Sequence, residues 1–196
     1  MSSYQIRVAR PSDGEALAAL YALYAKDTAI TFEYAVPTGE DFAGRVRHTL
    51  ARYPYLVAEG EEGLLGFVCA SPFKERAAYD WAVETSIYVA KGAHGMGVGR
   101  HLYEALESAL APMGITNLNA CIAYTGEPDA HLDNSSVYFH EKMGYRMVGR
   151  FYQCGYKFDH WYDMVWMEKM IAPHTVPAAP VTPFDPDSFQ PVTCEG

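Results

Sequence analysis

The spacing of hydrophobic and polar residues changes repeatedly along the chain between that of a strand and that of a helix. Residues 4–10 alternate as in a β-strand, whereas the apolar residues of 17–24 recur at helical intervals. Ser12 and Glu15 stand at the spacing of a capping box, which predicts that the first helix begins there. A second helix is expected over 38–50, from Thr38 through Leu50.

The pattern then predicts a succession of strands with two further helices between them. The glycines of 60–63 predict a turn between the first two strands, and Pro112 and Gly114 predict the end of the third helix. Expected strands are 55–59, 64–71, 82–89, 117–124, 146–156 and 161–170, and expected helices are 98–110 and 136–143. This order predicts an α+β domain with a central mixed sheet and helices on both faces.

The composition changes after Ile171. Half of the twelve prolines lie in this last part, at Pro173, Pro177, Pro180, Pro183, Pro186 and Pro191. Such a segment forms neither a regular helix nor a central strand. We therefore divide the chain into a domain over 1–171 and a proline-rich extension over 172–196, expected to lie extended against the domain or a neighbouring subunit.

Composition and charge exclude several classes of function. The 196 residues suffice for one domain with a real core, and 49% are hydrophobic. The net charge of -9 argues against a nucleic-acid partner. The apolar runs are too short for a membrane span, the N-terminus lacks a secretion signal, and four scattered cysteines suit a reducing compartment. We expect a cytoplasmic protein without a membrane partner.

A glycine-rich loop carries the strongest chemical signal. Three alternating glycines stand between a β-branched strand and an amphipathic helix, where a tight turn exposes several amide groups. At a helix N-terminus these donors suit a pyrophosphate. The spacing matches neither a Walker A loop nor a Rossmann fingerprint. The expected binding residues are His94, Gly95, Met96, Gly97, Val98, Gly99 and Arg100.

This loop resembles motif A of the GNAT-family N-acetyltransferases, usually written Arg/Gln-x-x-Gly-x-Gly/Ala. Gly97 and Gly99 match the motif, whereas His94 stands where the family prefers Arg or Gln. Further stretches are similar to the phosphinothricin acetyltransferases of that family, in order along residues 4–170. They are the strand Val83-Glu84-Thr85-Ser86-Ile87-Tyr88-Val89, the second cofactor motif at 136–145, the closing hairpin at 155–163, and the shorter stretches 31–33 and 72–79.

The resemblance implies a GNAT-like fold with a mostly antiparallel, twisted sheet. It implies acetyl transfer from acetyl-CoA, by direct attack, to the amine of a small amino-acid-like substrate of the phosphinothricin or methionine sulfoximine type. It also implies a homodimer. Other amines remain open, namely a polyamine, an aminoglycoside or a protein N-terminus, as does a non-catalytic acetyl-CoA-binding module. No metal is expected, because the seven histidines lack a paired-ligand spacing.

Two residues are candidates for catalysis. The period of a strand places Glu84, Ser86 and Tyr88 on one face, and a carboxylate within an apolar strand is costly without a use. The resemblance places a catalytic glutamate at Glu84, with a structural carboxylate as the alternative. His140 stands four residues before Gly144, where many relatives carry a general-acid tyrosine, and its titration range suits proton transfer near neutrality. A structural histidine is equally open.

The remaining site residues follow from the resemblance. The backbone of Ile87, Tyr88 and Val89 is expected to bind the pantetheine arm, and Ser136, with Asn134 or Ser135 before it, opens the second cofactor motif. Arg76 suits a substrate carboxylate because a guanidinium binds it through two hydrogen bonds, although a solvated surface arginine is the alternative. The expected substrate-binding residues are Phe32, Glu33, Arg76, Tyr79 and Lys157.

Overall fold

The computed structural model describes residues 3–196 and contains one eight-stranded sheet in the order β6-β7-β5-β4-β3-β2-β1-β8. All neighbouring strands are antiparallel except β4 and β5, which run parallel. The strands are β1 (Ser3–Val8), β2 (Tyr55–Gly60), β3 (Gly63–Pro72), β4 (Ala82–Val89), β5 (Asn117–Tyr124), β6 (Arg146–Lys157), β7 (His160–Met170) and β8 (Val192–Glu195). The predicted mixed, mostly antiparallel sheet is confirmed.

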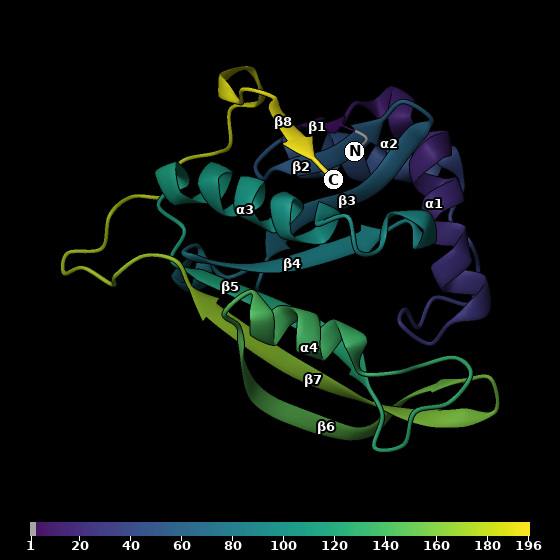
Figure 1. The fold of residues 1–196 in the computed structure, drawn as a ribbon. Coiled ribbons are helices and arrows are strands. Elements are labelled where there is room, and N and C mark those ends of the chain that lie inside the picture. Colours follow the sequence, from purple (N-terminus) through teal and green to yellow (C-terminus); the bar gives the residue numbers. More distant parts are fainter. Residues whose placement is uncertain (1–2) are drawn as a thin grey trace.

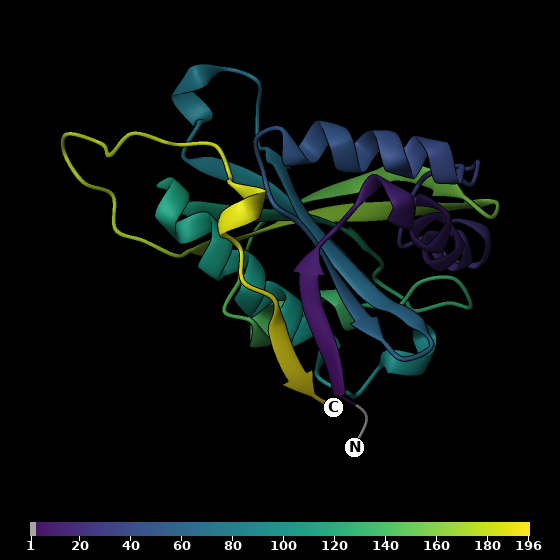
Figure 2. The same cartoon turned by 90° about the horizontal axis from the view of Figure 1, so that it is seen from above.

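Helices cover both faces of this sheet, as predicted (Figures 1 and 2). Helices α1 (Gly14–Asp27) and α2 (Gly39–Leu50) pack on one face, and α3 (Val98–Leu110) and α4 (Ser135–Lys142) pack on the other. The capping box predicted at Ser12 is wrong. A 3-10 turn at Pro11–Asp13 comes first, and the Asp13 carboxylate accepts a hydrogen bond from the Arg10 amide at 2.7 Å.

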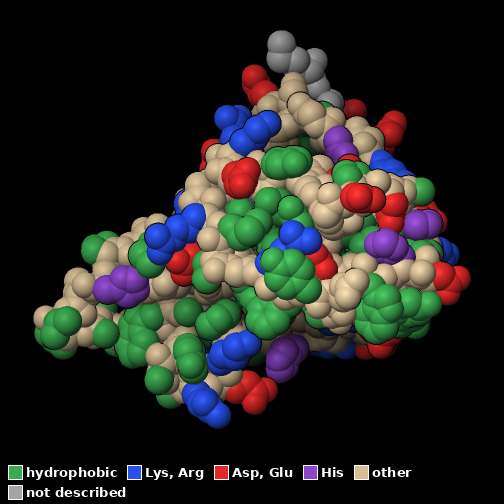
Figure 3. Space-filling model, turned by 90° about the horizontal axis from the view of Figure 1, so that it is seen from below, with side chains coloured by type: hydrophobic (Ala, Val, Ile, Leu, Met, Phe, Trp, Pro, Cys, Tyr) green, Lys and Arg blue, Asp and Glu red, His purple; other side chains and the backbone are tan. Residues whose placement is uncertain are grey.

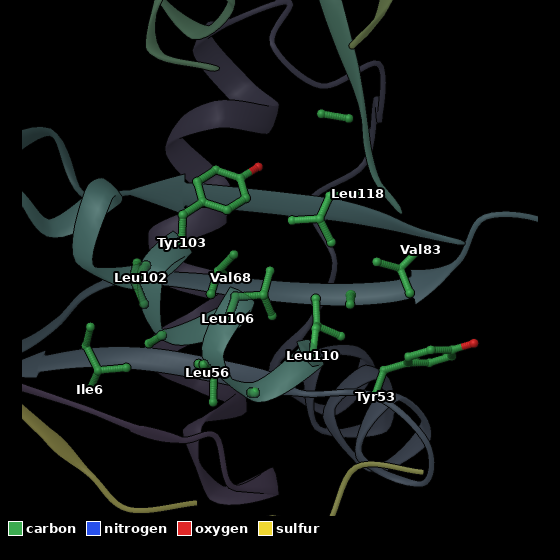
Figure 4. Close-up of a cluster of buried hydrophobic side chains, with 14 of the residues drawn as sticks. Ile6, Tyr53, Leu56, Val68, Val83, Leu102, Tyr103, Leu106, Leu110 and Leu118 are labelled. Atoms are coloured by element: carbon green, nitrogen blue, oxygen red, sulfur yellow. The ribbon is translucent and has the colours of Figure 1, made fainter. Parts of the chain in front are cut away.

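The larger core lies between the sheet and α3. Leu102, Leu106 and Leu110 of α3 are fully buried against strand residues such as Val68 and Leu118 (Figure 4). These three leucines repeat every four residues, which places them on one helical face. The first residues of α3 are thereby held directly beside the end of β4.

The parallel pair β4 and β5 separates part-way along its length. Its pairing comprises Ala82 with Asn117, Val83 with Leu118 and Glu84 with Asn119, and it stops there. Beyond this point β4 continues to Val89 along β3, while β5 continues to Tyr124 along β7. The sheet therefore has a gap in its middle, and we refer to it below as the β4–β5 gap.

The proline-rich extension folds back onto the domain. It crosses the end of α3 and adds β8 beside β1, where Cys194 pairs with Tyr4 (Figure 2). Phe184 and Cys194 are buried in the larger core. The segment thus forms an edge strand, the one kind of strand position that neighbouring prolines tolerate.

Candidate active site

The glycine-rich loop is exposed and ends in unpaired helix donors. Gly95 and Gly97 have φ angles of 86° and 77°, in the region that favours glycine. His101 is the first residue whose amide bonds back into the helix, to the Gly97 carbonyl at 3.0 Å. The preceding amides of α3 therefore have no acceptor within the helix, and Gly97 offers no side-chain cap. This arrangement fits the diphosphate of acetyl-CoA.

Beyond Glu84, strand β4 presents to the β4–β5 gap backbone groups that do not pair with β5. The Ala90 amide bonds to the Leu65 carbonyl of β3, so alternate residues of β4 direct their backbone towards β3. Ile87 and Val89 therefore direct theirs away from β3, to the side that β5 has left. The gap is lined by Ile30, Thr85, Ser86, Ile87, Tyr88, Ala120, Cys121, Ile122, Ala123, Leu132, Ser136 and His140. An extended amide-bearing chain such as pantetheine fits beside Ile87.

Tyr24 of α1 is a residue that the sequence pattern did not single out. Its hydroxyl donates to the Val89 carbonyl and accepts from the Val89 amide at 3.3 Å. His94 of the glycine loop reaches the same carbonyl through Nε2 at 3.3 Å. Tyr24 and His94 thus fix the end of β4 where it enters the loop. His94 thus bonds to the end of the strand, and its predicted contact with the cofactor stays a prediction.

Glu84 lies where the two strands part. It is half-buried, and within residues 3–196 no hydrogen bond holds its carboxylate. Burial raises the pKa of Glu84, and the charge of Lys74 partly opposes this shift. Such a group binds a proton more readily near neutral pH than an exposed glutamate does, which suits a general base.

His140 is buried in a network of hydroxyl groups beneath the gap. Its Nδ1–H donates to the Ser136 carbonyl at 2.7 Å, so in the neutral ring Nε2 accepts from the Tyr103 hydroxyl at 2.8 Å. The Tyr103 hydroxyl also lies 3.2 Å from Thr85 Oγ1. Burial lowers the pKa of His140, although the bond to Ser136 opposes the shift. The ring lines the gap, and both of its nitrogens are engaged in hydrogen bonds.

The start of α4 is fixed by its own side chains. Asn134 bonds to both backbone groups of Thr125, accepting at 3.2 Å and donating at 2.8 Å, and so joins α4 to the end of β5. Ser136, one turn before His140, lines the gap. Of these two predicted cofactor residues, Ser136 therefore faces the gap, while the Asn134 amide is used within the protein.

The predicted substrate residues separate into three groups. Phe32 packs against the β6–β7 hairpin, where a Cβ at Gly155 would lie 2.4 Å from its ring. Lys157 is buried, and its ammonium donates at 2.8 Å to three backbone carbonyls, those of Ala25, Thr28 and Thr31. This lysine connects the hairpin to the end of α1.

Arg76 and Tyr79 form the second group and lie on the exposed β3–β4 loop. The Tyr79 ring contacts Phe73, which in turn contacts Trp166 of β7 at a centroid distance of 5.4 Å. Neither Arg76 nor Tyr79 lines the gap or the cavity beside it. A carboxylate-binding role for Arg76 stays a prediction, as do the roles assigned to Tyr79, Phe32 and Lys157.

Glu33 makes up the third group and lines a cavity of about 300 Å³ between the sheet and helices α1 and α2. The residues around it are Tyr21, Glu33, Phe42, Arg45, Thr49, Tyr55, Phe67, Cys69, Ser86 and Tyr88. Ser86 and Tyr88 also line the β4–β5 gap, so the two spaces meet at these residues. Ser86 is exposed in the middle of a sheet for this reason.

The fold and the site agree with what comparison with known proteins finds. Residues 6–166 match the family described as "Acetyltransferase (GNAT) domain". The chain belongs to the GNAT family of acetyltransferases and is an N-acetyltransferase. The resemblance inferred from the glycine loop and the β4 strand is confirmed.

Individual relatives narrow this similarity. The chain is 32% identical to a phosphinothricin N-acetyltransferase of Streptomyces coelicolor, covering 84% of this chain and 95% of the relative. It is 26% identical to an L-methionine sulfoximine/L-methionine sulfone acetyltransferase of Salmonella typhimurium, covering 89% and 98%. A phosphinothricin acetyltransferase from Sinorhizobium meliloti, solved in complex with AcCoA, superposes with a TM-score of 0.80 at 27% identity, covering 96% and 98%.

Within residues 3–196 no helix is both long and apolar enough to cross a membrane. In the same part of the chain no three His, Cys, Asp or Glu side chains gather at a spacing that would hold a metal ion.

Proposed function

We propose that this enzyme transfers the acetyl group of acetyl-CoA to the amine of a small amino-acid-like substrate, of the phosphinothricin or methionine sulfoximine type. The names of the relatives support this substrate class. The acetyl-CoA thioester supplies the activated acyl group that the amine attacks. The chain itself must bind the thioester, accept a proton from the amine and stabilise negative charge on the carbonyl oxygen.

The observation that carries the proposal is the continuity of three features along one strand. Glu84 lies where β4 and β5 part, the backbone of Ile87 is free beyond it, and the uncapped amides of α3 follow the same strand. An aliphatic amine is almost entirely protonated at neutral pH, so attack requires a base. Glu84 accepts this proton, directly or through a water molecule, and a gap-facing amide of β4 donates to the developing oxyanion.

Direct attack is favoured over a cysteine-bound intermediate. Cys69 and Cys121 are the thiols near Glu84, and burial raises their pKa to about 12 and about 11. Both are therefore protonated and weakly nucleophilic at neutral pH. We propose that the amine attacks the thioester directly and that the group which protonates the leaving thiolate lies on the α4 side of the gap. His140 is the candidate, and to act as this acid its Nε2 must carry a proton instead of accepting one from the Tyr103 hydroxyl.

The test is thiol release from acetyl-CoA with a panel of amines. We expect turnover with phosphinothricin or methionine sulfoximine, and a loss of about 10²–10⁴-fold in kcat/KM for Glu84→Gln. The control is Glu62→Gln in the exposed β2–β3 turn, which should leave kcat/KM unchanged. Turnover confined to polyamines, aminoglycosides or peptide N-termini would contradict the proposed substrate class. Tight binding of acetyl-CoA without turnover of any amine would favour a non-catalytic module.

We further propose that the enzyme is a homodimer. Exposed aromatic side chains lie on β6 and β7, with Phe151 and Trp161 each 55% exposed and Tyr152 73% exposed. Figure 3 views this side of the molecule, where groups of hydrophobic side chains lie among scattered charged ones. Large aromatic residues of this kind are enriched at protein interfaces.

Light scattering after gel filtration tests the dimer. The double variant Phe151→Glu/Trp161→Glu should be a monomer. The matched control is Tyr138→Glu on α4, which is 59% exposed but lies outside β6 and β7, and should leave the mass unchanged. A wild-type monomer at micromolar concentration would contradict the proposal.

We also propose a cytoplasmic location, because the four cysteines are free.

A further inference from the structure

The cavity beside the gap contains an ion pair that uses only part of its hydrogen-bonding capacity. Arg45 of α2, whose side chain is 43% exposed, donates through Nη2 to Glu33 Oε1 at 2.9 Å. The other oxygen, Glu33 Oε2, is buried and has no hydrogen-bond partner within residues 3–196. The nearby Tyr21 hydroxyl bonds instead to Thr31 Oγ1 at 2.6 Å. A buried carboxylate oxygen without a donor is costly, so this oxygen indicates a missing N–H or O–H group.

Arg45 is positioned by the helix rather than by chance contact. Phe42, Arg45 and Thr49 are spaced by three and four residues, and all three line the cavity. The guanidinium carbon lies 5.0 Å from the centre of the Phe42 ring and 6.0 Å from that of Tyr21. These rings hold the side chain at the mouth of the cavity, while the hydrogen bond to Glu33 uses one of its five N–H groups and leaves others available.

The rest of the cavity wall is mostly aromatic. Tyr55, Phe67 and Tyr88 stack along the sheet, with centroid distances of 5.6 Å and 5.2 Å between successive rings. The cavity therefore presents a cation, an unpartnered anionic oxygen next to it, and an apolar interior. Its volume of about 300 Å³ suits a single small molecule.

We propose that Arg45 and Glu33 together bind the zwitterionic end of an α-amino acid, which names the acceptor class and rests on the proposed function. Arg45 donates to the α-carboxylate, and Glu33 Oε2 accepts from the α-ammonium. The side chain of the amino acid lies among the aromatic rings, so an uncharged one, such as that of methionine sulfoximine, fits this space. Because Ser86 and Tyr88 line both spaces, the amine is held next to the opening into the gap. Arg45, and not Arg76, is then the carboxylate-binding residue.

The experiment compares three acceptors that share one side chain: L-methionine, L-methioninamide and 3-(methylthio)propylamine. The wild type should prefer the free acid. Arg45→Gln should lower kcat/KM for L-methionine by about 10–100-fold, chiefly through KM, while changing that for the amide and the amine by less than about 3-fold. Glu33→Gln should weaken all three acceptors alike, because each carries the ammonium.

Matched controls separate this role from general effects. Arg47 lies on the same helix and is similarly exposed, but it pairs with Glu40 at 2.6 Å and does not line the cavity, so Arg47→Gln should leave all three acceptors unchanged. Arg45→Lys keeps the charge and the fold and should lie between wild type and Arg45→Gln. An unaltered preference for the acid in Arg45→Gln, or its loss in Arg76→Gln, would overturn the proposal. Failure of the wild type on all three while phosphinothricin or methionine sulfoximine is acetylated would also overturn the proposal. Failure on these two acceptors as well would instead contradict the proposed function.

Discussion

At the scale of single residues, the electrostatic surroundings of Glu84 matter more than its contacts. Burial raises its pKa, and the positive charge of Lys74 opposes this shift. Lys74 lies over the rings of Phe73 and Trp166, with its nitrogen 4.9 Å and 5.6 Å from their centres. Aromatic side chains therefore hold a positive charge near the proposed base.

This arrangement predicts the effect of removing the charge. The ionised form of Glu84 accepts the proton, so kcat/KM should rise with pH through the pKa of Glu84. Lys74 lowers that pKa, and Lys74→Met should therefore move the acid limb of the pH profile to higher pH. Lys26→Met, on the exposed end of α1, should leave the limb in place. A limb that moves to lower pH would contradict this role for Lys74.

The buried position of His140 should make the stability of the protein depend on pH, in addition to any effect on catalysis. Burial depresses its pKa in the folded protein, so its contribution is present above the unfolded value near 6.5 and is lost as pH falls towards the folded value. His140→Gln should flatten the fall in the free energy of unfolding over this range, by at most about 1.4 kcal/mol per pH unit. Urea denaturation between pH 7 and 5 measures it. The exposed His48→Gln variant serves as the control, and an equal slope in wild type and His140→Gln would exclude the effect.

At the scale of secondary-structure elements, the junction of β4 and α3 depends on two glycines with positive φ. Gly97→Ala places a side chain at a φ of 77° and should destabilise the fold by about 1–2 kcal/mol. It should also raise the KM for acetyl-CoA, because the uncapped amides of α3 begin at this turn. Gly92→Ala is the matched control, since a Cβ there meets nothing within 4 Å and its φ is not positive. Equal KM values for acetyl-CoA in the two variants would show that this turn does not contribute to cofactor binding.

The elements themselves could largely be predicted from the sequence, because each depends on local spacing. The ends of β5 were predicted at 117–124, and the other strand and helix ends differ by at most a few residues. The capping signal at Ser12 failed because the Asp13 carboxylate serves both the Arg10 amide and the Arg7 guanidinium, at 2.7 Å and 2.8 Å. A spacing rule alone does not tell which of two neighbouring polar residues, Ser12 or Asp13, forms the cap.

The site could be predicted only in part, because several of its contacts join distant segments. The strand of Glu84 and the glycine loop follow each other in sequence, and the pattern placed both. The Lys157 ammonium instead binds carbonyls 126 to 132 residues away, and the Tyr24 hydroxyl binds Val89 across 65 residues. The sequence pattern did not predict Arg45 as a site residue, because an arginine on an amphipathic helix is normally a surface residue.

At the scale of the whole molecule, the proline-rich extension is part of the folded unit. The Phe184 side chain is buried in the larger core, and the Phe184 amide bonds to the Arg52 carbonyl at 2.9 Å. The sequence-based boundary at residue 171 therefore marks a change of composition, while the packing of the core continues beyond it. The division of the chain into a domain over 1–171 and an extension over 172–196 stays a prediction.

This packing predicts that a change in the extension destabilises the whole domain. Phe184→Ala should lower the free energy of unfolding by about 3 kcal/mol, with one urea transition seen by both circular dichroism and aromatic fluorescence. Val176→Ala in the same extension should have no effect, because Val176 is fully exposed. Loss of stability confined to a separate early transition would show that the extension unfolds independently.

The gap has a mechanical consequence for the molecule. In the part of the chain that the structure describes, three β4–β5 ladder pairs join the half of the sheet that holds β1 to β4 with the half that holds β5 to β7. The hydrophobic layer under α3 supports this junction from one side. The joint between the halves is thus the place where the sheet can flex most easily. A thioester bound there would contact both halves of the sheet and hold them together. The junction between the two halves should accordingly be less mobile when the acyl donor is bound and more mobile after the thiol product has dissociated.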